Sequence, residues 1–299
     1  MSKRTIAVMG ATGHIGQVLT EELLKKGNQV RALGRDAGKL GHLRSLGAET
    51  HTPSFEDSQA LATAFQGADA VFAMIPPSYG AEDFSLYQNQ VGEAITEAVV
   101  HSGVPNVLLL SSIGADKKEG VGPIANLHFQ EKRLAEVKGL NLLCLRPSYF
   151  MENLFWSIPV IQGMGIHGTP LRADLKIPMV TTRDIGHKAA EFLDAINFQG
   201  TSVFELGGPR DLTMTEVTAI LGQAIGKPGL NYVQFPYEDA KKGMVGSGMK
   251  PPMADLMLEM NRAFNEGRLE PTQALTANPR GTTTIEEFAK GFAGAYSQS

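Results

Sequence analysis

Three glycines near the start of the chain have the spacing of a loop that binds phosphate groups. They are Gly10, Gly13 and Gly16 of the segment GATGHIG, which follows the apolar run TIAVM at 5–9 and opens a stretch with apolar residues at helical spacing. In such a loop the first glycine makes the turn out of the strand, the second lets a pyrophosphate approach the backbone, and the third lets the helix pack closely. The helix N-terminus then favours the negative charge. We expect a dinucleotide site here; the alternative is a tight turn without a ligand.

The residues after the second expected strand, at 29–33, select between NAD and NADP. An acidic side chain at that place binds the ribose hydroxyls of NAD and repels a 2′-phosphate. This chain has Arg35 just past the strand and Lys39 one helical turn later. Two such cations can hold a 2′-phosphate. Asp36 is the nearby carboxylate and could instead cap the next helix. We therefore expect NADP(H) in preference to NAD(H), although a solvated basic helix start would give the same pattern.

Residue types that form metal sites or nucleophiles show no functional spacing. The His residues show no metal-ligand spacing with a carboxylate or a cysteine, so no metal site is expected. Cys144 lies in the apolar run LNLLCLRP and is expected to be a buried structural thiol. The segment SSIGAD lacks the spacing of a nucleophile elbow, which argues against a serine hydrolase.

Alternating strands and helices must hold these residues in place. Continuous apolar or β-rich runs predict strands at 5–9, 29–33, 49–52, 69–75, 106–112 and 141–147. After the helix that follows the glycine loop, further helices are expected at 36–46, 57–65, about 83–102 and about 125–138. Strand–helix units that repeat in this way predict an α/β fold, a Rossmann-type doubly wound parallel sheet flanked by helices.

The rhythm changes after residue 147, where the chain becomes irregular, apolar and aromatic. Strands are expected at 202–206 and 230–235, and helices at 183–196, after a capping box at 213–216, at about 252–266 and at about 284–295. We expect a NAD(P)-binding domain at 1–150 and a smaller α+β lobe at 151–299 packed against it, with some of that chain returning to the first domain. The cleft between the two is the expected ligand site.

Composition and charge narrow the classes of function. The chain has 299 residues, of which 42% are hydrophobic, and a net charge of −4, which is ordinary for a folded globular protein. No Lys/Arg block resembles a nucleic-acid footprint, and no apolar stretch is long enough for a membrane span or a signal segment. We therefore expect a cytoplasmic protein that binds neither nucleic acid nor membrane.

Taken together, the motifs resemble those of the NmrA-like family of atypical short-chain dehydrogenases/reductases. The resemblance is carried by GATGHIG at 10–16, VRALGRDAGK at 30–39, FEDSQALATAFQGADAVFAMIPPS at 55–78, SGVPNVLLLSSIGA at 102–115, HFQEKRLAE at 128–136, LRPSYFMEN at 145–153 and TTRDIGHKAAEFL at 181–193. Proteins of this family that are similar to the present chain include NAD(P)H-dependent quinone, azo-dye and triphenylmethane-dye reductases. The family also contains redox sensors that bind the dinucleotide without turning it over.

The resemblance implies a set of cofactor and acceptor residues. The diphosphate would lie at Thr12, Gly13, His14 and Ile15, between Gly10 and Gly16, and the 2′-phosphate at Arg35 and Lys39. The adenine would lie against Phe55 and Glu56, the ribose beside Met74, Ile75 and Pro76, and the nicotinamide near Lys132, Pro147, Tyr149 and Phe150. Tyr149, Phe150 and Asn153, with His128, would line the acceptor pocket, because planar apolar acceptors stack on aromatic surfaces. Leu154, Phe155 and Trp156 are expected to be largely core.

The chain departs from orthodox short-chain dehydrogenases at two catalytic positions. Those enzymes have a Tyr four residues before a Lys and a Ser after the fifth strand, and the Tyr moves the proton. Here Lys132 is present, but His128 stands in place of the Tyr and Ile113 in place of the Ser, just after Ser111 and Ser112. His128 could donate a proton, or it could be a polar helix residue hydrogen-bonded to the backbone. Both interpretations stay open, and His128 and Lys132 are the candidate catalytic residues.

These departures divide the expected functions. An alcohol dehydrogenase or an epimerase needs a strong proton relay beside the carbonyl group, and the His/Ile pair does not provide one. A quinone-like or dye-like acceptor is already electrophilic, so water or an imidazole could supply the proton once the hydride is transferred. We expect NADPH-dependent reduction of such an aromatic acceptor by direct hydride transfer, without flavin. The alternative is a non-catalytic NADP(H) sensor, and a homodimer or a regulatory protein partner is compatible with either.

Overall fold

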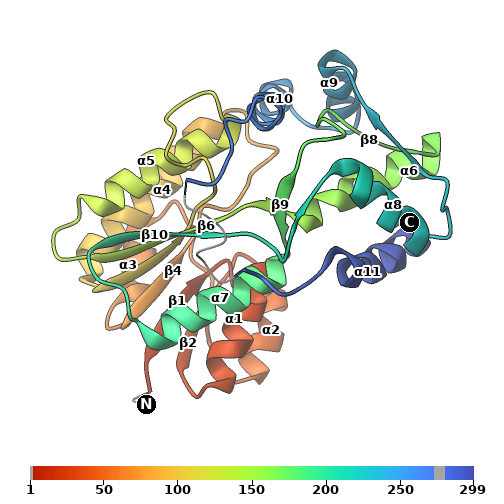
Figure 1. The fold of residues 1–299 in the computed structure, drawn as a ribbon. Helices are drawn as coiled ribbons and strands as arrows, with labels where there is room; N and C mark the ends of the chain where they lie inside the picture. Colours follow the sequence, from red (N-terminus) through yellow and green to blue (C-terminus); the bar gives the residue numbers. More distant parts are fainter. Residues whose placement is uncertain (1–2, 273–279) are drawn as a thin grey trace.

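The computed structural model describes residues 3–272 and 280–299. Its central feature is a seven-stranded parallel sheet with the strand order β10-β6-β5-β4-β1-β2-β3 (Figure 1). The strands are β1 (Thr5–Met9), β2 (Gln29–Leu33), β3 (Glu49–His51), β4 (Ala70–Ala73), β5 (Asn106–Leu110), β6 (Asn141–Pro147) and β10 (Thr201–Leu206). The expected Rossmann-type α/β fold is confirmed, and β1, β2 and β6 have the bounds that the sequence predicted.

Helices cover both faces of this sheet, which explains why its strands are continuous apolar runs. On one face lie α1 (His14–Lys25), α2 (Ala37–Ser45) and α7 (Thr182–Ala195), packed on strand residues such as Ile6 and Val8 (Figure 1). On the other lie α3 (Ser58–Phe65), α4 (Phe84–Ser102) and α5 (Ala125–Ala135), packed on residues such as Ala7 and Met9. Successive residues of a strand point to opposite faces, so both sets have to be apolar.

The strand order reverses at β1 and brings two loops together. From β1 the chain runs outward to β2 and β3, and it then returns to β4 on the other side of β1. The loops that leave the carboxyl ends of β1 and β4 diverge to opposite faces, and ligands of open α/β sheets bind in the crevice between such loops. Residues 10–16 leave β1 and residues 74–76 leave β4, so the expected cofactor segments flank this crevice.

The chain that follows β6 builds a second part around two small sheets. One sheet contains β7 (Tyr149–Phe150), β9 (Ile177–Val180) and β11 (Asp211–Leu212), and in the other β8 (Ile166–Thr169) pairs with β12 (Asn231–Gln234). The helices of this part are α6 (Ile158–Met164), α8 (Met214–Ala224), α9 (Tyr237–Gly246), α10 (Pro251–Asn265) and α11 (Ile285–Gln298) (Figure 1). Between them, α7 and β10 return to the large sheet, where β10 pairs with β6. The division into domains at residue 150 stays a prediction.

Sequence patterns identified only some elements of this second part. The capping box at 213–216 is confirmed at the start of α8, where the Thr213 hydroxyl accepts from the backbone N–H of Glu216 and the Glu216 carboxylate accepts in return from the backbone N–H of Thr213. Strands β7, β8, β9 and β11 and helices α6 and α9 were not expected. These strands are two to four residues long and pair with distant segments, which periodicity cannot reveal.

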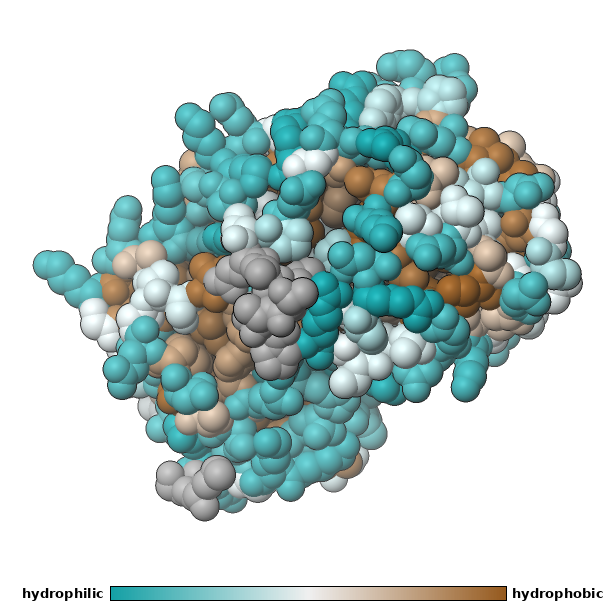
Figure 2. Space-filling model, in the orientation of Figure 1, coloured by the Kyte–Doolittle hydropathy of each residue, from teal (hydrophilic) through white to brown (hydrophobic). Residues whose placement is uncertain are grey.

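A third hydrophobic core joins the two parts. It contains Ile113, Val121 and Ile124 from the chain after β5, together with residues of α8, α10 and α11. The two parts approach closely at Gly122, whose φ is +60° and where a Cβ atom would collide with the carbonyl group of Leu256 on α10. Figure 2 shows apolar side chains as small patches in a mostly hydrophilic surface over both parts, as is ordinary for a globular protein.

Candidate functional site

The glycine loop has a backbone geometry that fits the roles expected of its residues. Gly10 has a φ of +65° at the turn out of β1, and its carbonyl oxygen accepts from the Gly13 N–H at 2.9 Å. A Cβ atom on Gly16 would lie 2.7 Å from the Gly10 carbonyl carbon and closer still to the oxygen. Because backbone atoms cannot give way, residue 16 has to be glycine if α1 is to begin here. Gly13 is exposed, and a Cβ atom there would meet only the Gly10 oxygen, at 3.3 Å.

The first turn of α1 is not capped by any side chain of residues 3–272 and 280–299. Its N-cap residue is Gly13, which has no side chain to accept from the first N–H groups, and the first turn contains no acidic residue. The next three helices, α2, α3 and α4, each begin with an Asp whose carboxylate accepts from their first turn. Without such an acceptor, α1 offers its N–H groups and the positive end of its dipole to an anion. Thr12, exposed His14 and buried Ile15 frame this open turn.

Arg35 and Lys39 follow β2 with unpaired charges. Both side chains are exposed, and neither makes an ion pair within residues 3–272 and 280–299. The Asp36 carboxylate is engaged in the helix: its Oδ1 accepts from the backbone N–H of Gly38 at 2.8 Å and from that of Lys39 at 3.2 Å. Asp36 therefore caps α2, as the sequence indicated.

Three chain segments meet at this end of the site around Tyr87 of α4. Burial raises the pKa of Tyr87, while the charge of Arg35 lowers it and the charge of Glu56 raises it. Both charged groups must lie near the Tyr87 hydroxyl to act on it. Of the two expected adenine contacts, Glu56 is exposed and the neighbouring Phe55 is buried in the core under α3 and α4.

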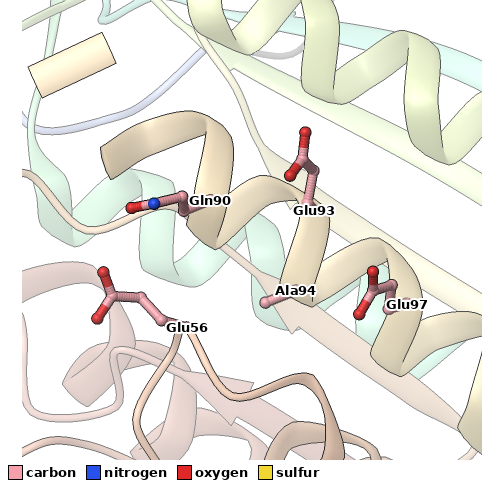
Figure 3. A pocket seen from close by; sticks show the side chains of 5 residues that line it. All are labelled: Glu56, Gln90, Glu93, Ala94 and Glu97. Carbon is pink, nitrogen blue, oxygen red and sulfur yellow. The ribbon is translucent and has the colours of Figure 1, made fainter. Parts of the chain in front are cut away.

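A cavity of about 400 Å³ opens beside Glu56, between the loop after β3 and helix α4. Figure 3 shows Glu56 on one side of it and Gln90, Glu93, Ala94 and Glu97 of α4 on the other. Three carboxylates repel a phosphate group, so neither the diphosphate nor the 2′-phosphate of a dinucleotide would bind in this cavity.

The segment after β4 closes the glycine loop from the other side. The sulfur of Met74 lies 3.0 Å from where a Cβ atom on Gly10 would stand. Ile75 and Pro76, which follow, are buried. The structure therefore brings Met74, which was expected beside the ribose, into contact with the loop that was expected at the diphosphate.

His128 and Lys132 lie on α5 in different surroundings. The His128 ring is half-buried, with its Nδ1 2.9 Å from the carbonyl oxygen of Ala115 and the Phe129 ring edge-on at 5.5 Å. A carbonyl oxygen only accepts, so Nδ1 carries the donated proton and Nε2 is the other ring nitrogen available to a ligand. The backbone therefore orients the imidazole, a partner that the sequence did not reveal. Lys132 is exposed and makes no ion pair within the part of the chain that the structure describes.

A buried charged cluster next to these residues was missed by sequence reasoning. Arg146 of β6 donates to both carboxylate oxygens of Glu131 on α5, at 2.9 Å and 2.5 Å, and Ser111 donates to the same carboxylate at 2.5 Å. Burial opposes the charge of Arg146, but its hydrogen bonds to Glu131 and the attraction between them raise the pKa of Arg146. All three residues are buried, and they tie the carboxyl ends of β5 and β6 to α5. Separations of 15 and 20 positions leave no local signal for this cluster.

The expected serine position is apolar in the structure as in the sequence. Ile113 is buried in the third core, and its backbone N–H donates to the Pro147 carbonyl oxygen at 3.1 Å. Ser111, two residues earlier, already donates its hydroxyl to Glu131. Neither of these two residues therefore offers a free hydroxyl for a proton relay.

The turn after β6 places the expected acceptor residues in different surroundings. Tyr149 packs edge-on against Phe264 of α10 at 5.9 Å, and burial raises the pKa of its hydroxyl. Phe150 packs on the core beneath α1 and α7, and Pro147 is buried. Asn153 is exposed. Tyr149 thus packs into the second part, whereas the side chain of Phe150 packs on the large sheet's core.

The expectation that Trp156 is largely core is wrong. Leu154 is buried, and Phe155 stacks on Phe292 of α11 at 5.8 Å, as core residues would. Trp156 is 63% exposed. It lies in the 3₁₀ segment η2 (Met151–Ser157), where each residue advances by a third of a turn, so the side chain after Phe155 leaves the core that Phe155 enters.

Among residues 3–272 and 280–299, no three His, Cys, Asp or Glu side chains gather as metal ligands would. No helix of that part of the chain is long and apolar enough to cross a membrane. Burial raises the pKa of the Cys144 thiol, which suits a structural residue rather than a nucleophile.

This arrangement of sheet, glycine loop and second part is shared with known proteins. The model of the NmrA-like family matches residues 2–289. The chain belongs to the NmrA-like family. The membership expected from the sequence motifs is therefore confirmed over nearly the whole chain.

Three of the similar proteins are named as reductases or oxidoreductases. The NAD(P)H azoreductase of Xenophilus azovorans is 29% identical over 295 residues, which are 97% of this chain and 99% of that protein. The NADPH-dependent quinone oxidoreductase of Escherichia coli, in a crystal structure with NADPH, is 25% identical with a TM-score of 0.79, covering 96% of this chain and 99% of its own. The triphenylmethane reductase of Citrobacter sp. shares the fold, with a TM-score of 0.79 at 23% identity over 97% of this chain and 99% of its own. The relatives support an NAD(P)H-dependent oxidoreductase over a regulator.

Proposed function

We propose that this member of the NmrA-like family uses NADPH to reduce a quinone-like or azo-dye-like aromatic acceptor, by direct hydride transfer and without flavin. Relatives named for NAD(P)H azoreductase and quinone oxidoreductase activity align with it over nearly its whole length. The structural observation that carries the proposal is the uncapped first turn of α1 behind the Gly10 turn. Location in the cytoplasm, a homodimer and a regulatory partner stay predictions from the sequence.

The residues of the glycine loop fit the diphosphate of a dinucleotide. Gly13 leaves the backbone open to approach, and the N–H groups of Thr12, His14 and Ile15 would donate to phosphate oxygens in place of the missing cap, since the Gly13 N–H is already bonded to Gly10. Gly10 and Gly16 fix the shape of the turn. Met74, with Ile75 and Pro76 behind it, would lie beside the ribose because it already contacts the loop.

The preference for NADP(H) over NAD(H) rests on the cations after β2. Arg35 can hold a 2′-phosphate through two parallel hydrogen bonds, and Lys39 adds a point charge. Asp36 does not compete for them, because its carboxylate caps α2. Glu56, which acts on the same Tyr87 as Arg35, would accept from the adenine amino group.

At the nicotinamide end, the exposed ammonium of Lys132 would hold the ribose, and Pro147, Tyr149 and Phe150 would bound the ring. When bound, NADPH supplies the hydride. The neutral His128 ring presents Nε2 as an acceptor, so it can donate a proton there only after taking one up. Because the acceptor is electrophilic, water can supply the proton. We therefore assign His128 and Asn153 to the lining of the acceptor pocket.

The test is NADPH oxidation by the purified protein against a panel of acceptors. The panel contains 1,4-benzoquinone, methyl red and a triphenylmethane dye, each with NADPH and with NADH. We expect oxidation that depends on the added acceptor and that has a lower KM for NADPH than for NADH. The control variant Gly13→Val should stay folded by circular dichroism and lose both binding and turnover, because a branched side chain fills the space that the pyrophosphate needs.

Two results would contradict this proposal in different ways. Tight NADPH binding without oxidation by any acceptor would favour the sensor. A folded Gly13→Val variant that keeps its cofactor affinity would show that the loop is only a turn.

A further inference from the structure

Two aromatic side chains from different parts of the chain meet at the surface. Tyr79 lies in the loop between β4 and α4, and Trp156 lies in η2; their ring centres are 6.1 Å apart and the rings are nearly perpendicular, at 82°. Tyr79 is 42% exposed and Trp156 is 63% exposed. We call these two residues the aromatic rim. Single exposed apolar side chains are ordinary on a protein surface, but two aromatic rings in contact there offer a ligand continuous apolar area.

The aromatic rim is held by the residues around it. The Tyr79 ring is stacked on Phe84 at 6.5 Å, with 8° between the planes, and Phe84 is itself buried. Three residues after Tyr79, the Glu82 carboxylate lies 2.6 Å from the Lys250 ammonium at the start of α10. The same loop is therefore packed on α4 through Phe84, and an exposed ion pair links it weakly to the second part. The stacking on buried Phe84 holds the Tyr79 ring in place.

The aromatic rim adjoins both segments that the proposed function assigns to the site. Tyr79 follows Pro76 in the loop that leaves β4, and Trp156 follows Asn153 by one turn of η2. Within η2, Met151 and Leu154 point into the third core, while Trp156 points outward. The rim thus lies outside the segments expected at the nicotinamide, where a long acceptor would extend from the reacting ring.

We propose that the aromatic rim is a distal subsite that binds a second ring of an extended aromatic acceptor. This inference rests on the proposed function and adds the residues that would contact the second ring of an acceptor in which aromatic rings are linked. Rings set edge to face offer both a ring face and a ring edge for stacking, and the bound ring would shield apolar surface that is now in water. We expect a single-ring quinone bound at the nicotinamide not to extend to the rim.

The kinetic test compares a short acceptor with a long one. 1,4-Benzoquinone has one ring and the azo dye methyl red has two. Trp156→Ala should raise the KM for methyl red about tenfold, the size expected for loss of an aromatic contact with its apolar area. The KM for benzoquinone and the Kd for NADPH should stay unchanged, and Trp156→Phe should recover most of the loss. The matched control is Met164→Ala, since Met164 is 64% exposed and lies on α6, and it should behave as wild type.

A binding test uses the fact that Trp156 is the only tryptophan of the chain. Its emission therefore reports on the aromatic rim alone. Titration of methyl red into the protein saturated with NADP⁺ should quench this emission to saturation, after correction against free N-acetyltryptophanamide. Tyr79→Ala should raise the dye concentration needed for half of the quenching, because it removes the second ring of the rim.

Each other result has a definite meaning. Equal losses with benzoquinone and methyl red would place Trp156 in the fold or the general acceptor site, and unchanged KM values with both would remove it from acceptor binding; either result overturns the distal subsite. If Trp156→Ala instead converts a dimer into a monomer in sedimentation velocity while the KM for methyl red is unchanged, the rim is a contact between copies. If wild type oxidises NADPH with neither acceptor, the proposed function has failed and the subsite fails with it.

Discussion

The diphosphate end and the acceptor end of the site are built from different parts of the polypeptide. At the diphosphate end the shape comes from backbone atoms of one short segment. Gly10 has a positive φ, and Gly16 lies close to the Gly10 carbonyl group. Beside the acceptor end it comes from side chains that meet across the sequence, above all Glu131 and Arg146. A Cβ atom added to a glycine disrupts the diphosphate end, whereas removal of a side chain disrupts the acceptor end.

This difference bears on where specificity can change. Backbone N–H groups are the same in every residue, so the glycine loop can serve a dinucleotide whatever acceptor is reduced. Side chains such as Tyr149, Asn153 and Trp156 can be exchanged without altering the large sheet. This construction is compatible with relatives that are named for azo and for quinone reduction, because different acceptor sites can be placed on one fold.

The largest effect is expected where a side chain is removed from the buried cluster. Glu131→Ala leaves the charge of Arg146 buried without a partner, which should lower the free energy of unfolding by about 3–5 kcal/mol. Replacing both residues by Met should cost less than Glu131→Ala alone, because no charge is then left buried. The measurement is urea unfolding, with Asp174→Ala as the control, since that carboxylate pairs with Arg172 on the exposed surface and should contribute little. If Glu131→Ala is as stable as Asp174→Ala, the Glu131–Arg146 pair does not shape the acceptor end, and the contrast with the diphosphate end is wrong.

The second effect concerns side chains at the adenosine end. Arg35→Ala combined with Lys39→Ala should weaken NADPH binding by about 1.5–3 kcal/mol, roughly 10- to 100-fold, while NADH binding changes little. Calorimetry with both cofactors measures this, and Lys290→Ala on α11 controls for the loss of a positive charge. Equal losses for the two cofactors, or tighter binding of NADH than of NADPH by wild type, would contradict the NADP assignment.

The third effect comes from adding a methyl group at the diphosphate end. Gly16→Ala should lower the free energy of unfolding by about 1–3 kcal/mol, because its Cβ atom collides with the Gly10 carbonyl group. Gly41→Ala in the middle of α2 is the matched control: it meets nothing within 4 Å, and it should be neutral or stabilise by about 0.5–1 kcal/mol. Chemical denaturation of both variants gives the comparison. Similar changes in unfolding free energy for the two variants would mean that the loop backbone moves enough to relieve the collision at residue 16.

The fourth effect is a titration in the second part. The Thr218 hydroxyl donates to the Met214 carbonyl oxygen, so it accepts from the Nδ1–H of His167 at 2.6 Å. The buried Nε2 has no hydrogen-bond partner within residues 3–272 and 280–299 and would have to take the added proton. Burial lowers the pKa of His167 to about 4. The unfolded chain, with a pKa near 6.5, then binds the proton first. Stability from neutral His167 is therefore complete above about pH 6.5 and falls as the pH drops toward 4, by at most about 1.4 kcal/mol per pH unit.

Unfolding free energies between pH 7 and pH 4.5 test this for wild type and His167→Gln. The difference between the two should change with pH in that window, whereas His101→Gln, at an exposed position, should track wild type. A constant difference would show that His167 does not titrate as its burial requires.

The smallest effect is expected at His128. Its Nδ1 is engaged by the Ala115 carbonyl, so the neutral ring has no proton to give from Nε2. His128→Ala should therefore change the turnover of benzoquinone and the Kd for NADPH by less than about threefold. Lys132→Ala should instead raise the apparent Kd for NADPH. A general acid contributes about 100-fold or more. A loss of that size in His128→Ala, with cofactor binding intact, would assign the proton to the imidazole.

The sequence predicted the features that are built within one segment, and it did not predict those that depend on contacts between distant segments. The glycine turn, the Asp36 cap, the capping box at 213–216 and the buried strands are set within one segment, so residue types and spacing reveal them. The Glu131–Arg146 pair, the Ala115 partner of His128 and the exposure of Trp156 arise only when distant segments pack. A run such as SYFMENLFW gives the same apolar pattern whether a ring enters the core or leaves it. Periodicity cannot separate Phe155 from Trp156.

The place of β10 in the large sheet has a consequence for synthesis of the protein. β6 ends at Pro147, but its neighbour β10 is complete only at Leu206, after the whole of η2, α6 and α7 has been made. A ribosome that adds about 5–20 residues per second needs about 3 to 12 s to cover that interval. Throughout it, the nascent chain carries β6 as an unpaired apolar edge, and such an edge is a template for pairing with other chains. The yield of folded protein in a cell should therefore depend on how many chaperones and competing nascent chains the emerging β6 meets in those seconds.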